Sequence, residues 1–236
     1  MIVPRFTQER CVILSDGGVE SLLACAMANE QQQLSGADSI AASVLLPGWW
    51  EWTNEIDLMI SAVDPAVVRQ AGVYGLDIFP NQSVYPPDDE RLLAECSIGS
   101  IQSRILLEAA QVALRAGIRK VIWPVRLARP ESDQSVDQLV DQIGQTIDRA
   151  ILASRLASLD ASDGTAVDVI IETPFVDLSD DQMADLAGDL AIPLETCWWH
   201  NGRTLPNAQE RFEYWSKMIL RSPSQIESKP RQQSRA

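Results

Sequence analysis

The sequence lacks the marks of several large protein classes. None of its apolar runs approaches the length that a membrane-spanning helix needs. The first run, at residues 11–14, is followed by Asp16 and two glycines too soon to form a signal peptide. No two cysteines form a CxxC pair, so we expect reduced thiols in a cytoplasmic protein. The four cysteines are Cys11, Cys25, Cys96 and Cys197, of which the first two lie in apolar segments typical of a core.

Histidine and basic residues are also scarce. His200 is the only histidine, and its neighbour Cys197 has no orienting group evident, which disfavours Ser–His or Cys–His catalysis. The 19 basic and 33 acidic residues give a net charge of −14, which disfavours binding to nucleic-acid phosphates. The basic stretch after Arg221 is short and lacks interleaved aromatic residues. We therefore expect neither a nucleic acid nor a membrane as partner, and this charge is compatible with a small nucleotide held by a local site.

What the sequence does contain is an alternation of strand-like and helix-like segments. It predicts an α/β fold, a Rossmann-like doubly wound parallel sheet of about five strands, in a single domain over residues 1–220. The polar tail, 221–236, is expected to be disordered. Strands are expected near residues 11–14, 40–46, 75–79, 119–125 and 167–171. Helices are expected from the glycines to about 33, then at 53–69, 103–116, 134–159, 179–190 and 208–220.

Three of these helices carry distinctive patterns. Pro65 falls inside the second, which predicts a break near Asp64. The apolar positions of 134–159 form one stripe from Val136 to Leu156. In the helix near 179–190, Ser179 and Gln182 predict a capping box. The acids Asp180 and Asp181 are better explained by this helix start than by catalysis.

The glycine corner after the first strand is the candidate ligand site. Gly17 and Gly18 separate the strand from a helix, whose free N–H groups and dipole favour an anion. There is no GxGxxG spacing and no P-loop lysine. The glycines are equally compatible with tight packing, and an Asp16 carboxylate at the helix start can occupy the N–H groups that a phosphate needs. Glu20 is either a Mg²⁺ ligand or an acid that complements the dipole.

Three tryptophans after the second strand, Trp49, Trp50 and Trp52, allow two interpretations. They line a pocket for a planar ligand, or they cap a core or an oligomer contact, which is the commoner role.

The corner also carries a resemblance to a known family. Ser15-Asp16-Gly17-Gly18-Val19-Glu20-Ser21 resembles the SGGxDS signature of PP-loop ATP pyrophosphatases. Within them the chain most resembles the 7-cyano-7-deazaguanine synthase (ExsB) family. Two further regions of the chain resemble the family, and they occur in the same order as in the family. They are the helix and strand over residues 99–125 and the segment from Ile170 to Trp198, which is similar to "TP-x-x-x-L", a helix and "T-x-SC-Y".

The resemblance has departures. Asp16 stands for a serine and Glu20 for an aspartate, while Gly17, Gly18 and Ser21 match. The family's "GRN" arginine is missing, because that stretch falls on residues 100–102; Arg104 or Arg126 is a possible substitute. Of four zinc-binding cysteines only Cys197 matches, the others falling on Gly202, Leu205 and Ala208. Since His200 adds at most one ligand, we predict no zinc, and we expect His200 in a surface loop.

The resemblance implies an adenine nucleotide alpha hydrolase-like fold and an ATP-dependent C–N ligase related to queuosine biosynthesis. It would activate a carboxylate or carbonyl for attack by a nitrogen nucleophile, on a small molecule such as a deazapurine, as a possible homo-oligomer. ATP would be held by Asp16, Gly17, Gly18, Val19, Glu20 and Ser21, with Mg²⁺ on Glu20; no catalytic residue is assigned. The alternative is a catalytically degenerate paralogue that serves as a binding or partner protein.

Overall fold

A computed structural model describes residues 9–34, 42–49, 56–86, 97–127, 135–160, 168–201 and 208–221. Its centre is a sheet of five strands, all parallel, in the order β3-β2-β1-β4-β5. The predicted fold class, a Rossmann-like parallel α/β sheet of about five strands, is confirmed. The strands are β1 (Cys11–Ser15), β2 (Val44–Pro47), β3 (Asp77–Ile78), β4 (Lys120–Ile122) and β5 (Ile170–Glu172).

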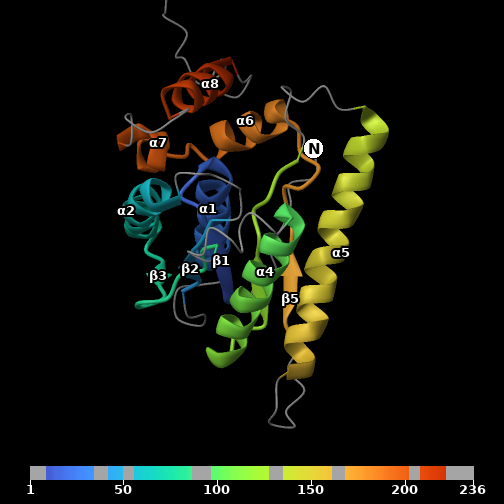
Figure 1. Ribbon diagram of the computed structural model, residues 1–236. Helices are drawn as coiled ribbons and strands as arrows, with labels where there is room; N and C mark the ends of the chain where they lie inside the picture. Colours follow the sequence, from blue (N-terminus) through green and yellow to red (C-terminus); the bar gives the residue numbers. More distant parts are fainter. Residues whose placement is uncertain are drawn as a thin grey trace, which may run out of the picture.

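Helices cover both faces of this sheet (Figure 1). Because successive side chains of a strand point to opposite faces, Cys11 and Ile13 enter one core while Val12 and Leu14 enter the other. The second core is covered by α4 (Ile98–Arg115) and α5 (Val136–Asp160). The first is covered by α1 (Val19–Leu34), α2 (Ile56–Tyr74), α6 (Asp180–Asp189), α7 (Trp198–Asn201) and α8 (Ala208–Arg221), with a 3₁₀ turn at Leu194–Thr196.

The helix boundaries follow local capping signals. The predicted capping box is confirmed, since Ser179 accepts from the Gln182 N–H and the Gln182 side chain accepts from the Ser179 N–H. α4 begins earlier than the predicted residue 103, because the Ser97 side chain accepts from the Ser100 N–H and caps the helix. α5, α6 and α8 begin and end within a few residues of the predicted positions.

Strand boundaries differ more from the predicted ranges. The strands expected at 40–46, 75–79, 119–125 and 167–171 are shorter or shifted. The reason is visible after β4, where Trp123 and Val125 continue the buried apolar run although β4 ends at Ile122. An apolar run in the sequence indicates which residues are buried. In this fold the buried residues extend beyond those that form strand-to-strand hydrogen bonds.

The expected break at Pro65 is wrong. α2 continues from Ile56 to Tyr74 through the proline. A proline removes one intrahelical donor and is unfavourable inside a helix. Here Val63, Ala66 and Val67 around it are fully buried in the first core, and this tertiary packing stabilises the continuous helix.

The stripe on α5 does not form its buried face. The residues that face the sheet and α4 are small, whereas Val136, Val140 and Leu156 are exposed. The buried set is Thr146, Ala150, Ala153, Ser154 and Ala157. Small residues let α5 approach α4 and β5 closely and leave most of its larger apolar side chains outside, although Ile143 is half-buried against the second core. Among the helices described, none is both long and apolar enough to cross a membrane.

Candidate functional site

The glycine corner lies where β1 ends, at the middle of the sheet. β1 pairs with β2 on one side and with β4 on the other, so the chain order reverses here. Ligands of parallel α/β sheets bind at the carboxyl ends of the strands next to such a reversal. The segments that border it are residues 16–18 after β1 and 123–127 after β4. The glycine corner therefore lies at the position where ligands of such sheets generally bind.

Gly17 is required by its backbone and by its neighbours. Its φ angle is +69°, in the left-handed region that favours glycine. A Cβ on Gly17 would lie 2.8 Å from the Cβ of Ala66 in α2. The Gly17 carbonyl accepts from the Trp198 N–H at 3.0 Å, which joins the corner to α7. Tight packing therefore accounts for a glycine at this position.

Asp16 fills the corner with its own carboxylate. Its Oδ1 accepts from the Gly18 N–H at 2.8 Å and from the Ser21 hydroxyl at 2.5 Å. The Asp16 N–H in turn donates to Ser21 Oγ at 3.1 Å. A Cβ on Gly18 would lie 3.0 Å from Asp16 Oδ1, so the second glycine makes room for this carboxylate. Gly18 precedes α1, so its bond to Asp16 is a local turn bond rather than one to a helix N–H group. Two of the donors expected to hold pyrophosphate, the Gly18 N–H and the Ser21 hydroxyl, are nevertheless taken by Asp16.

A buried network of hydrogen bonds connects the corner to Gln70 of α2. Ser15 Oγ accepts from the Gly17 N–H at 3.2 Å and donates to Gln70 Oε1 at 3.3 Å. The Gln70 side-chain amide donates to the Gly18 carbonyl at 3.2 Å. Ser15 and Gln70 are both fully buried. Sequence reasoning missed Gln70; the available signal was a polar residue on the helix face that carries Val63 and Val67.

A buried ion-pair cluster adjoins the corner through Glu20 in the first turn of α1. Arg126, which follows β4, is almost fully buried, and its Nε donates to Glu20 Oε1 at 3.0 Å. Its Nη1 donates to Asp180 Oδ1, and Tyr214 donates its hydroxyl proton to Asp180 Oδ2. The Arg126 guanidinium also lies 5.3 Å from the centre of the Trp215 ring. The cluster joins α1, α6 and α8 around one cation.

The cluster shows which of the two arginines, Arg104 or Arg126, lies near the corner. Arg126 reaches the corner, whereas Arg104 is exposed on α4 and lines a groove beside α5. Asp180 is more than a helix-start acid, since it is buried and binds Arg126. Glu20, the residue assigned to Mg²⁺, forms an ion pair with the Arg126 guanidinium through its Oε1. Within the described residues, no three His, Cys, Asp or Glu side chains gather as a metal site.

The remaining predicted residues mostly belong to the core. Val19 is fully buried, and Trp49 packs edge-on against Trp198 with ring centres 6.2 Å apart, as a core residue. Cys197 is completely buried, and desolvation raises the pKa of its thiol well above the usual range. His200 lies in α7 rather than in a loop, with its ring 5.5 Å from that of Phe212. Trp50, Trp52, Cys96, Gly202, Leu205 and the tail at 222–236 lie outside the described residues.

The fold and the candidate site together define a Rossmann-like parallel α/β protein whose glycine corner is occupied by its own Asp16 carboxylate. No family model matches the sequence, and no curated protein matches it. Among solved structures, the chain is similar to the U34-tRNA thiolase NcsA from Methanococcus maripaludis with its [4Fe-4S] cluster. The two share 15% identity at a TM-score of 0.47, over 94% of this chain and 74% of that one.

Proposed function

We propose that this chain is a catalytically degenerate member of the PP-loop group that acts as a binding or partner protein without using ATP. The observation that carries the proposal is the Asp16 carboxylate, which accepts from the Gly18 N–H and the Ser21 hydroxyl. An internal anion thus takes the place of the pyrophosphate. The link to the PP-loop group rests on the order of the three similar sequence regions.

Electrostatics favours the same conclusion. A phosphate about 4 Å from the Asp16 carboxylate would meet a repulsion of roughly 4 kcal/mol at an effective dielectric of about 20. Arg126 does not offset it, because two carboxylates, Glu20 and Asp180, already contact its guanidinium. The cluster therefore adds no net positive charge for an incoming nucleotide.

A second candidate function is the ATP-dependent ligase that activates a carboxylate or carbonyl of a small molecule. The position of the corner at the carboxyl end of β1, beside the reversal of strand order, favours it. It requires the Asp16 carboxylate to leave Gly18 and Ser21, and the Glu20–Arg126 pair to open. In that case the six residues from Asp16 to Ser21 would take the roles that the resemblance implies.

Isothermal titration with Mg-ATP separates the two functions. For the wild-type protein we expect no binding heat at millimolar nucleotide. The Asp16→Ser variant removes the internal anion and restores the hydroxyl of the family signature, so we expect it to gain measurable binding. Asp181→Ser, an exposed acid in the first turn of α6, is the matched control and leaves the result unchanged. Binding by the wild-type protein would contradict the proposal and favour the ligase.

A further inference from the structure

The outward face of α5 carries large apolar side chains that no described element covers. Leu159 and Leu152 are 82% and 63% exposed, and Ile151 is 43% exposed. α5 is the longest described helix, with 25 residues, and it stands at the outer edge of the molecule beside α4 (Figure 1). A helix on the surface of a monomer usually places polar residues on this face.

We propose that this face is a homodimer interface, in which α5 packs antiparallel against α5 of a second copy. The two-fold axis passes between Ile151 and Leu152. A two-fold interface uses the same surface twice, so its residues must complement each other about the axis. The sequence of α5 meets this requirement in charge and in size.

The charges complement each other about this axis. In an antiparallel pair centred between residues 151 and 152, Asp148 lies opposite the partner's Arg155, and Arg155 lies opposite the partner's Asp148. Both side chains are exposed, and they lie on the same outward side of the helix, seven residues or about two turns apart. Within the described residues neither forms an ion pair. The pairing thus gives each charge an opposite partner in the second copy.

The sizes complement each other as well. Gly144 lies opposite the partner's Leu159 in the same arrangement. A Cβ on Gly144 would have nothing within 4 Å, so there is open space at this position. Leu159 is the most exposed large apolar residue on α5, and in the proposed pair it packs where Gly144 presents no side chain.

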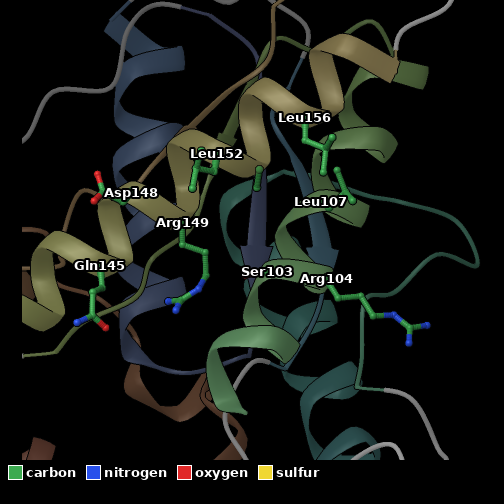
Figure 2. Close-up of a pocket in the computed structure, with 9 residues that line it drawn as sticks. Ser103, Arg104, Leu107, Gln145, Asp148, Arg149, Leu152 and Leu156 are labelled. Carbon is green, nitrogen blue, oxygen red and sulfur yellow. The ribbon is translucent and has the colours of Figure 1, made fainter. Parts of the chain in front are cut away.

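A groove between α4 and α5 extends the apolar surface. It has a volume of about 580 Å³, and Figure 2 shows Leu107 of α4 beside Leu156 of α5, with Leu152 further along α5. The groove lies on the flank of α5 that carries Leu152, where the second copy's Leu152 packs. One helix pair about 37 Å long buries less surface area than a standard protein–protein interface. We therefore expect a dissociation constant of the dimer in the micromolar range.

Sedimentation velocity of the full chain, from submicromolar to high micromolar concentration, tests the interface with charge-swap variants. Asp148→Arg and Arg155→Asp each place like charges opposite each other at two symmetric positions. We expect either variant to weaken dimerisation by at least about tenfold. The double variant reverses both charges and restores the opposite pairing, so it dimerises as the wild type does. Asp189→Arg, an exposed reversal on α6, is the control and leaves dimerisation unchanged.

Each result decides the proposal. A wild-type protein that stays monomeric throughout the range overturns it. Dimerisation that neither single reversal weakens, or a double variant that stays as weak as the single ones, also overturns it. Circular dichroism of each variant verifies the fold, which exposed substitutions on α5 leave intact.

Discussion

At the residue scale, two independent constraints require glycine at position 17. Its φ angle of +69° lies in the left-handed region, and a Cβ there would lie 2.8 Å from the Cβ of Ala66. We expect Gly17→Ala to lower the free energy of unfolding by about 2 to 4 kcal/mol, from backbone strain and overpacking together. Gly72→Ala is the matched control, because it lies in α2 with nothing within 4 Å of its Cβ. Gly72→Ala should raise stability by about 0.5 to 1 kcal/mol. Urea unfolding measures both, and equal effects would contradict the packing account.

The residues of the corner were only partly predictable. The bond between the Asp16 carboxylate and the Gly18 N–H follows from short-range geometry, because it spans two residues. Gln70 and Tyr214 reach the site from far along the chain, and no local rule brings a residue of α2 or α8 to β1. The choice between Arg104 and Arg126 likewise needed the tertiary structure.

At the scale of elements, the Arg126 cluster connects helices that are distant in sequence. α1 contributes Glu20, α6 contributes Asp180, and α8 contributes Tyr214, all around one buried guanidinium. A buried carboxylate without its cation is strongly unfavourable. The cluster therefore holds α8 against the carboxyl ends of the strands and contributes to closing the corner.

Arg126→Met tests this connection. The change keeps an apolar stem but leaves two carboxylates without their cation, so we expect a loss of about 3 to 5 kcal/mol in the free energy of unfolding. Arg104→Met, at the exposed arginine that the sequence could not separate from Arg126, should change it by no more than about 0.5 kcal/mol. Denaturant unfolding compares the two variants. Similar losses in both would mean that the cluster does not stabilise the fold.

Elements with local signals were predictable, and those decided by packing were not. α8 and the capping box of α6 follow from nearby residues. The continuity of α2 through Pro65 depends on the buried Val63 and Val67, and the exposed stripe of α5 depends on the close approach of α4. A periodic apolar pattern identifies a helix but does not tell which of its sides faces the sheet.

At the scale of the whole molecule, the three layers bury three thiols. Cys11, Cys25 and Cys197 are all buried, and desolvation raises the pKa of each thiol. The alternation of strands and helices predicted the layers, and the apolar segments around Cys11 and Cys25 predicted their core positions. For Cys11 the folded-state pKa rises from 9.0 to about 11.

This shift makes the fold sensitive to alkali. Below pH 9 the Cys11 thiol is protonated in both the folded and the unfolded chain, so it gives no pH dependence. Between pH 9 and about 11 the unfolded chain loses the proton that the folded chain keeps, so stability falls as the pH rises. Cys11 alone should contribute a slope of up to about 1.4 kcal/mol per pH unit in this window.

Urea unfolding of the wild type and Cys11→Ala at several pH values across this window measures that slope. We expect the variant to lose stability with pH less steeply than the wild type, and to run parallel to it below pH 9. Val12→Ala removes a neighbouring buried side chain without removing a thiol, so it should lower stability at every pH and keep the wild-type slope. Identical slopes for Cys11→Ala and the wild type would show that the buried thiol is not linked to unfolding, since a group with equal pKa values in both states contributes no pH dependence.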